Sequence, residues 1–204
     1  MPRSAPFVIG IAGGSASGKS TLAQATEERL GARCLRIAHD RYYRSAHDPE
    51  TNFDHPEALD TLALAQDLDR LRSGQPAHLP RYDFSSHQRL PKPELHLPRP
   101  ILIVEGILVL AVPELHTRLD LKIFVTAPAD VRLIRRLRRD VAERGRSMGD
   151  VLSQYERSVR PMHERFVAPS EAHADLVLDG MGHPRDLAQS LIEAIPGLYS
   201  GSWI

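Results

Sequence analysis

A run of glycine and serine residues near the amino terminus has the spacing of a phosphate-binding loop. It matches the pattern G-x-x-x-x-G-K-[ST] over Gly13, Gly14, Ser15, Ala16, Ser17, Gly18, Lys19, Ser20 and Thr21. Small residues let backbone N–H groups approach phosphate oxygens, and a helix that begins at such a loop directs its positive end at the same anion. Lys19 would place a charge at the terminal phosphates, and the Ser20 hydroxyl can ligate Mg²⁺. The loop therefore predicts a nucleoside triphosphate site, the alternative being a glycine-rich turn without a ligand.

Two acidic residues follow short apolar runs and are candidates for chemistry at that phosphate. Glu105 ends the run 101–104, and Asp40 follows the run 35–38. Doubly wound sheets place ligand groups at the carboxyl ends of their strands. We expect Glu105 to hold Mg²⁺ directly or through water, and Asp40 to accept the proton of an attacking hydroxyl. An acid at a strand end is more often a solvated turn residue, so the upstream phosphate loop is what favours these roles.

Seven arginines gather in one short segment, offset only by Asp140 and Glu143: Arg132, Arg135, Arg136, Arg138, Arg139, Arg144 and Arg146. Such a cluster is usually a solvated helix face or a nucleic-acid patch. A third interpretation is a lid, because the guanidinium fork suits the oxygens of a transferring phosphate. We expect Arg139, Arg144 and Arg146 to belong to a lid with hinge freedom at Gly145 and Gly149. We expect Arg132, Arg135 and Arg138 to be solvated.

The elements that must position these residues follow from the apolar pattern. Strands are predicted at 7–12, 35–38, 101–105, 121–125 and 176–178. Helices are predicted at 19–30, from residue 54 or 55 to 72, from 128 to 144, from about 148 to 166 with a potential break at Pro161, and at 185–195. Leu133, Leu137 and Val141 share one face of the third helix. The alternation of strands and helices predicts an α/β fold with a mainly parallel sheet and helices on both faces.

Length and composition fit a single domain. The chain has 204 residues, and the stretches 76–100 and about 139–160 read as insertions, the first a β-ribbon or extended flap and the second the lid. Equal numbers of basic and acidic residues, 26 each, give no support to a nucleic-acid or membrane-surface role. Cys34 is the only cysteine, which excludes an intrachain disulfide. No apolar stretch approaches 18 residues, so we expect a cytoplasmic protein.

Several short blocks follow the phosphate loop in a fixed order, and as a set this series resembles the uridine kinase family. The blocks are Asp40-Arg41-Tyr42-Tyr43, Asn52-Phe53-Asp54-His55-Pro56, Tyr82-Asp83-Phe84-Ser85-Ser86-His87-Gln88-Arg89, Glu105-Gly106-Ile107 and Glu143-Arg144-Gly145-Arg146, with further similarity through Gln154-Tyr155 and Ala174-Asp175. The resemblance covers nearly the whole chain. It implies a P-loop kinase that transfers the γ-phosphate of ATP to the ribose 5′-hydroxyl of uridine or cytidine, a step of pyrimidine salvage.

The resemblance also implies roles for individual residues. Asp40 matches the catalytic base, and Ser20, Glu105 and Asp40 match the residues around Mg²⁺. Arg139 and Arg144 match lid residues near the phosphates. The nucleoside-binding positions are matched by Asp54, Tyr82, His87, Arg136, Arg146 and Gln154. Relatives are commonly tetramers, so a homo-oligomer is expected.

The sequence departs from the family pattern at two positions, and several alternative interpretations are open. Arg41 stands where the family usually has serine, and we expect the neighbouring base to survive. His183 stands where many relatives carry an acid near the adenine end, which leaves the choice between ATP and GTP open. Without the family pattern, Tyr82 and Phe84 read as packing residues and His87 as a surface histidine. The rival functions are a phosphoribulokinase- or pantothenate kinase-like enzyme, a nucleotide-binding switch and an arginine-rich nucleic-acid binder.

Overall fold

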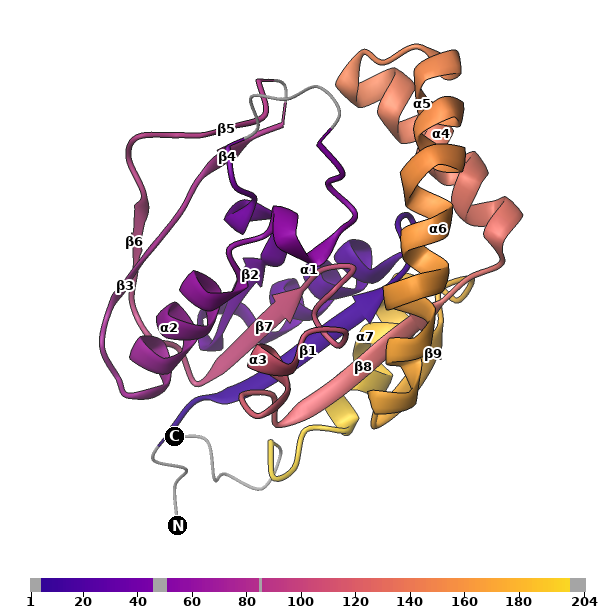
Figure 1. Ribbon diagram of the computed structural model, residues 1–204. Coiled ribbons are helices and arrows are strands. Elements are labelled where there is room, and N and C mark those ends of the chain that lie inside the picture. Colours follow the sequence, from indigo (N-terminus) through magenta and orange to yellow (C-terminus); the bar gives the residue numbers. More distant parts are fainter. Residues whose placement is uncertain (1–4, 46–50, 85, 199–204) are drawn as a thin grey trace.

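A five-stranded parallel sheet forms the centre of the molecule (Figure 1). The computed structural model describes residues 5–45, 51–84 and 86–198, so Ser85 lies outside the described residues. The strands are β1 (Phe7–Gly13), β2 (Cys34–Ala38), β7 (Ile101–Glu105), β8 (Leu121–Thr126) and β9 (Leu176–Asp179). Their order is β2-β7-β1-β8-β9, and every neighbouring pair is parallel. The predicted parallel sheet is confirmed, and its central strands are continuously apolar because they are buried on both faces.

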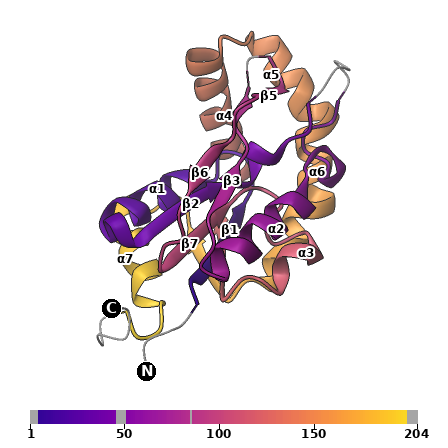
Figure 2. The same cartoon turned by 90° about the vertical axis from the view of Figure 1, so that its left-hand side faces the viewer.

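Helices cover both faces of this sheet, as Figure 2 shows from the side. On one face, α1 (Lys19–Leu30) and α7 (Pro184–Glu193) pack on Ile9 and Ile11 of β1. On the other, α2 (Thr61–Arg72) and α3 (Pro113–His116) pack on the side that Val8 and Ala12 line. Successive residues of β1 point to opposite faces, so one strand contributes to both cores. The strand thereby fixes where its carboxyl end, and the loop that follows, must lie.

The second helix begins later than the sequence pattern suggested. Asp60 is the N-cap of α2 and accepts a hydrogen bond from the Ala63 N–H at 3.3 Å. The segment Pro56–Ala58 forms a separate 3-10 turn, whose N-cap is His55. The prediction of a helix starting at residue 54 or 55 was therefore wrong. The carboxylate of Asp54 instead accepts a hydrogen bond from Ser158.

The segment 76–100 forms two short antiparallel pairs, which confirms the expected β-ribbon. β3 (Ala77–Leu79) pairs with β6 (Glu94–His96), and β4 (Tyr82–Asp83) pairs with β5 (Gln88–Arg89). In Figure 1 this ribbon and the helices α4 (Ala129–Arg144) and α5 (Met148–Gln154) stand on opposite sides of the molecule. The ribbon and the arginine-rich helices therefore flank the carboxyl end of the sheet.

Helical structure continues without a break from Met148 to His173. α5 passes into a π-helical segment (Tyr155–Val159), then α6 (Arg160–Met162), a second π-helical segment (His163–Val167) and a 3-10 segment (Ala168–His173). The potential break at Pro161 is not seen. Proline has no N–H to give and its ring crowds the preceding turn of a regular helix, and the wider π turns on both sides accommodate it. None of the helices in the described ranges has the length and apolar character needed to cross a membrane.

Candidate active site

The phosphate loop connects β1 to α1 through backbone conformations that favour glycine. Gly13 has φ 146° and Gly18 has φ 105°. A Cβ on Gly13 would lie 2.4 Å from the carbonyl oxygen of Val125. Gly180 closes the loop from outside, because a Cβ there would lie 2.0 Å from the carbonyl oxygen of Ser17. The loop is therefore held between neighbouring backbone segments, with the amino end of α1 directed into the site.

Two adjoining cavities meet at Lys19. The first encloses about 190 Å³ and is lined by Lys19, Ser20, Asp40 and Glu105 together with the ribbon and α4. The second encloses about 420 Å³ and is lined by Ala16 and residues 18–22, by Arg135, Arg139 and Glu143, and by Gly180, Gly182, Pro184 and Leu187. Because Lys19, Ser20 and Arg139 border both cavities, a phosphate chain bound on the loop would have one cavity at each end.

Four polar side chains lie together in the first cavity: Lys19, Ser20, Asp40 and Glu105. The Ser20 hydroxyl donates to the carboxylate of Glu105 at 3.0 Å, and Glu105 is only 5% exposed. Burial lowers the pKa of Lys19, while the carboxylates of Glu105 and Asp40 act to raise it. Hydroxyl and carboxylate oxygens are the ligands that Mg²⁺ takes from proteins, with waters and substrate phosphates completing its coordination. The side-chain oxygens of Ser20, Glu105 and Asp40 are therefore of the kind that would hold a magnesium ion.

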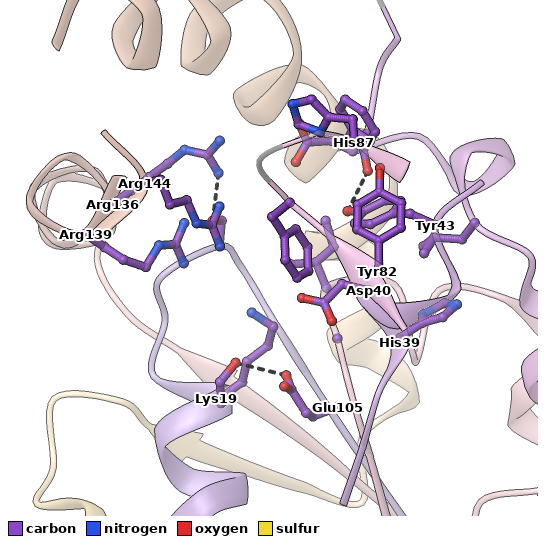
Figure 3. A pocket seen from close by; sticks show the side chains of 18 of the residues that line it. Lys19, His39, Asp40, Tyr43, Tyr82, His87, Glu105, Arg136, Arg139 and Arg144 are labelled. Atoms are coloured by element: carbon purple, nitrogen blue, oxygen red, sulfur yellow. Dashed lines mark hydrogen bonds between the residues drawn. The ribbon is translucent and has the colours of Figure 1, made fainter. Parts of the chain in front are cut away.

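Asp40 faces Lys19 across this cavity (Figure 3). Burial and the neighbouring Glu105 raise the pKa of Asp40 to about 6, against the opposing pull of Lys19, Arg144 and Arg139. A carboxylate with a pKa near neutrality is suited to take a proton from a hydroxyl in the transition state. The geometry on which the predicted base depends is therefore present.

Arg41 turns away from this carboxylate and toward the ribbon. Its Nε donates to the carbonyl oxygen of Pro80 at 2.8 Å, and its Nη2 donates to the Glu94 carboxylate at 2.6 Å. Arg89 reaches back from the ribbon and donates to the carbonyl oxygens of Tyr42 and Tyr43, each at 2.8 Å. Arg41 therefore ties the segment that carries Asp40 to the ribbon.

The aromatic residues of the ribbon line the cavity. His87, with φ 55°, stacks on Phe53 with the ring centroids 4.7 Å apart. The Tyr82 hydroxyl is buried and has no hydrogen-bond partner among the described residues, and burial raises its pKa. Phe84 contacts both the ribbon and α4. Its ring centroid lies 5.2 Å from that of Tyr82, and the guanidinium carbon of Arg144 lies 5.5 Å from the same centroid. All three residues line the first cavity, while His87 is exposed, as a surface histidine would be, and Phe84 packs on Tyr82.

Asp54 lies on the side of the cavity where α5 ends. Its carboxylate is buried and accepts a hydrogen bond from Ser158 at 3.0 Å. Burial raises the pKa of Asp54, and Arg136 acts against that shift. Gln154 lies nearby and accepts hydrogen bonds from Arg136 at 2.9 Å and Arg146 at 2.5 Å. All six residues expected at a nucleoside site line the first cavity.

The buried face of α4 is charged, which the sequence pattern did not predict. Its buried residues are Arg132, Arg136 and Asp140, whereas Val141, assigned to the apolar face, is 43% exposed. The helix lies against the phosphate loop rather than the apolar core, and Arg136 donates to the Ser15 hydroxyl at 2.8 Å. Proximity to an anion-binding loop therefore reverses the usual polarity of a helix face.

Two arginines expected to be solvated have defined partners. Arg132 is 8% exposed, and it donates to the carbonyl oxygen of Ala127 at 3.1 Å and lies 3.2 Å from Nε2 of His163. Arg135 donates to the carbonyl oxygen of Gly180 at 3.1 Å. The prediction was therefore wrong for both, because the backbone beside the phosphate loop offers acceptors, while Arg138 is exposed as expected.

Asp140 is the functional candidate that sequence reasoning missed. It is fully buried, and its carboxylate lies within 4.0 Å of four guanidinium groups, those of Arg136, Arg139, Arg144 and Arg146. Its spacing of four residues from both Arg136 and Arg144 is a signal that could have found it, since such residues share a helix face. Ser158 was also missed, and its place on a π-helical turn has no sequence pattern.

His183 acts as a cap rather than as a contact to the second cavity. It is the N-cap of α7, where its Nδ1 accepts a hydrogen bond from the Arg185 N–H at 3.3 Å. Its neighbours Gly182 and Pro184 line the second cavity. The residue therefore shapes the outer edge of that cavity through the start of α7.

Comparison with known proteins identifies the family of this chain. The model of the family described as "Phosphoribulokinase / Uridine kinase family" matches residues 8–185. The chain is 50% identical to the uridine kinase of Chloroflexus aurantiacus over 184 residues, which cover 87% of this chain and 88% of that one. It is 41% identical to the uridine kinase of Clostridium perfringens over 204 residues, which cover 95% and 98%.

Solved structures share the fold at lower identity. A possible uridine kinase from Bacillus stearothermophilus superimposes with a TM-score of 0.66 at 16% identity, covering 88% of this chain and 91% of that one. Phosphoribulokinase from Rhodobacter spheroides superimposes with a TM-score of 0.60 at 18% identity, covering 90% and 75%. The fold is thus shared with these two proteins at low sequence identity.

Proposed function

Because the chain belongs to the phosphoribulokinase / uridine kinase family, we propose that it is a uridine kinase, which transfers the γ-phosphate of ATP to the 5′-hydroxyl of uridine or cytidine. The observation that carries this proposal is the cavity in which Asp40 faces Lys19 beside a pocket of aromatic and polar side chains. The identity of 41–50% to curated uridine kinases over most of the chain supports the choice of acceptor.

In this reaction the 5′-oxygen of the nucleoside attacks the γ-phosphorus, and the bond from that phosphorus to the β–γ bridging oxygen breaks. Asp40 accepts the proton of the hydroxyl, and ADP leaves. Lys19 and the loop amides hold the phosphate chain, while Arg139 and Arg144 bring charge to the transferring group. Magnesium, held by Ser20, Glu105 and Asp40, would neutralise part of the phosphate charge.

The nucleoside would occupy the first cavity. Asp54 can accept hydrogen bonds from both ribose hydroxyls, and Ser158 holds one of its oxygens in place. His87 can donate to O4 of uracil or accept from N4 of cytosine, because imidazole has both capacities. The buried Tyr82 hydroxyl, which has no hydrogen-bond partner among the described residues, could bond the base. Arg136, Arg146 and Gln154 line the pocket on the lid side. The rings of Phe53 and Phe84 limit the space, which favours pyrimidines over purines.

The phosphate donor would place its nucleoside in the second cavity, between the phosphate loop and the start of α7. ATP is the proposed donor, with GTP the alternative that His183 leaves open. We also propose a cytoplasmic enzyme that assembles as a homo-oligomer, a tetramer by its family resemblance. Light scattering of the purified protein tests the assembly, and a monomer would contradict it.

The decisive experiment is phosphoryl transfer to a panel of acceptors. The purified protein, with ATP and Mg²⁺, should convert uridine and cytidine to the 5′-monophosphates, identified by mass and ³¹P spectra. Ribulose 5-phosphate and pantothenate should remain unchanged. Phosphorylation of either of these in place of the nucleosides would overturn the proposal, and binding of ATP with no transfer would favour the switch. Replacing ATP by GTP in the same assay settles the donor.

The variant Asp40→Asn identifies the base in the same assay. The amide keeps the shape of the side chain but cannot take the proton, so we expect the turnover number to fall roughly 10²- to 10⁴-fold. Binding of ATP, measured by calorimetry, should persist because the phosphate loop is untouched. Unchanged turnover would remove Asp40 from this role.

A further inference from the structure

Four arginines that face the first cavity converge on one buried carboxylate. Asp140 is 0% exposed, and the atoms of its carboxylate lie 2.8 Å from Arg139, 3.5 Å from Arg136, 3.5 Å from Arg144 and 3.9 Å from Arg146. We call these four arginines and Asp140 the arginine array. We propose that Asp140 is a positioning residue for phosphoryl transfer, which fixes the guanidinium groups of this array around the site of the transferring phosphate. The proposal rests on the proposed kinase function.

The arrangement follows from the geometry of α4. Arg136 and Arg144 lie one helical turn before and after Asp140, so all three share a face. Gly145, with φ 64°, ends the helix, and the turn returns Arg146 to the same carboxylate. One acidic side chain therefore collects arginines from two successive turns and from the segment beyond the helix.

The backbone of Asp140 holds the end of the helix independently of its side chain. The N–H groups of Gly145 and Arg146 both donate to the carbonyl oxygen of Asp140, the latter at 3.1 Å. Substitution of the carboxylate leaves these hydrogen bonds available. The side chain can therefore be tested apart from the helix end, and its effect is expected on the guanidinium groups.

The array has more positive than negative charge. One carboxylate at the centre balances one of four guanidinium charges, which leaves three. Burial lowers the pKa of Arg136 and of Arg144, while the carboxylate of Asp54 acts to raise the first and that of Asp40 acts to raise the second. An excess of guanidinium groups in fixed orientations is suited to an anion with several oxygens, such as a transferring phosphoryl group. A long arginine side chain is flexible, so its orientation needs fixed partners. Asp140 is the partner that all four share: Arg139 donates a hydrogen bond to it at 2.8 Å, and the other three pair with its charge.

The array is also joined to both substrate regions. Arg136 donates to Ser15 of the phosphate loop at 2.8 Å and to Gln154 at 2.9 Å. Arg144 lies over the ring of Phe84 in the ribbon, 5.5 Å from its centre. Displacement of these guanidinium groups would therefore change the catalytic geometry as well as the packing of α4.

The test compares Asp140→Asn with Asp130→Asn, which removes one negative charge from the exposed first turn of the same helix. With uridine and ATP, we expect Asp140→Asn to lower kcat at least roughly tenfold, since small displacements of catalytic groups have large kinetic effects. The KM for ATP should change less than about threefold, because the added positive charge offsets the loosened contacts. Asp130→Asn should match the wild type.

A double-mutant cycle with Arg144→Lys shows whether Asp140 acts through the arginines. We expect the loss of kcat caused by Arg144→Lys to be smaller in the Asp140→Asn background than in the wild type. Additive effects, or a loss confined to KM, would overturn the proposal. If thermal unfolding shows that Asp140→Asn is not folded at the assay temperature, the cycle is run with Asp140→Glu, which keeps the charge but moves the carboxylate. A wild-type kcat in that folded variant would also overturn it.

The outcomes separate this proposal from the proposed function. If the wild-type protein phosphorylates uridine and Asp140→Asn does so equally well, the positioning role fails and the kinase function stands. If the wild-type protein phosphorylates none of the acceptors in the panel, the kinase function itself fails.

Discussion

The phosphate loop and the arginine array bring positive charge to the same cavity by different means. The loop is built from backbone, with Gly13 and Gly18 in conformations that side chains disfavour. The array is built from long side chains, held by the buried carboxylate of Asp140. A backbone site depends on the space around a few glycines, whereas a side-chain site depends on pairing between charges. The phosphate loop and the arginine array should therefore respond to different kinds of substitution.

The largest effect is expected where the loop meets neighbouring backbone. In Gly180→Ala, the new Cβ would lie 2.0 Å from the carbonyl oxygen of Ser17 and 2.9 Å from that of Thr126, so the loop must shift. A shift of about 1 Å in a catalytic group can reduce the rate roughly a hundredfold, so kcat/KM for ATP should fall by at least that factor. Steady-state kinetics with ATP as the varied substrate measure it. Activity within threefold of the wild type would show that the loop does not depend on this contact.

A smaller effect is expected for one arginine of the array. Arg144→Lys keeps the charge but loses the planar fork, so kcat should fall roughly ten- to a hundredfold, with little change in the KM for uridine. Arg138→Lys is the matched control, because Arg138 lies on the same helix and is exposed. Equal kcat in the two variants would contradict a role for the Arg144 side chain beyond its charge.

The Asp40 carboxylate, which faces the phosphate loop, should lower the stability of the folded protein at neutral pH. Burial raises the pKa of Asp40 from 3.8 to about 6, so the folded protein holds a proton that the unfolded chain releases. Relative to the ionised carboxylate, the protonated Asp40 carboxyl stabilises the folded protein. This stabilisation is fully present below about pH 4 and is lost as the pH rises through about 6. Asp40→Asn should therefore be more stable than the wild type at pH 7.5, by roughly 1–3 kcal/mol.

Urea unfolding at two pH values checks this sign. The gain in free energy of unfolding caused by Asp40→Asn should be smaller at pH 4.5 than at pH 7.5, because the wild-type carboxyl is largely protonated in the folded protein at the lower value. A gain that is equal at both, or larger at pH 4.5, would show that the pKa of Asp40 is not raised.

The smallest effect is expected at a glycine of the lid that no neighbour confines. Gly149 lies within α5, and a Cβ there would meet only the Ser147 hydroxyl, at 3.9 Å. Gly149→Ala should increase the free energy of unfolding by about 0.5–1 kcal/mol, because alanine favours helix, and should leave kcat unchanged. Thermal unfolding and the kinase assay measure both. A fall in kcat would instead show that Gly149 acts as a hinge.

The contrast between the backbone-built loop and the side-chain-built array explains which features could be predicted from the sequence. The loop and α1 were predicted to the residue, because a backbone-built anion site needs glycines at fixed spacing. The five strands were predicted because continuous apolar runs in a parallel sheet have few other interpretations. The residues expected around the nucleoside were found at one cavity, but only the ordered family pattern pointed to Tyr82 and His87, whose types alone favour packing or the surface.

The face of α4 could not be predicted from its pattern. The usual rule places Leu133, Leu137 and Val141 inward, whereas the buried side chains are Arg132, Arg136 and Asp140. The rule assumes an apolar neighbour, and this helix has a phosphate loop as its neighbour. The start of α2 was misplaced for a related reason, since Asp54, an apparent cap, is held by a residue more than a hundred positions later in the chain.

The π-helical turn at Tyr155–Val159 limits how the chain length of the lid can vary. It separates Gln154, which binds Arg136 and Arg146, from Val167, which is anchored in the core. Each residue of a helix turns the chain by about 100°. Loss of a single residue between these two anchors would rotate the Gln154 amide to another side of the helix, out of reach of both arginines. Insertions and deletions between Gln154 and Val167 should therefore be poorly tolerated.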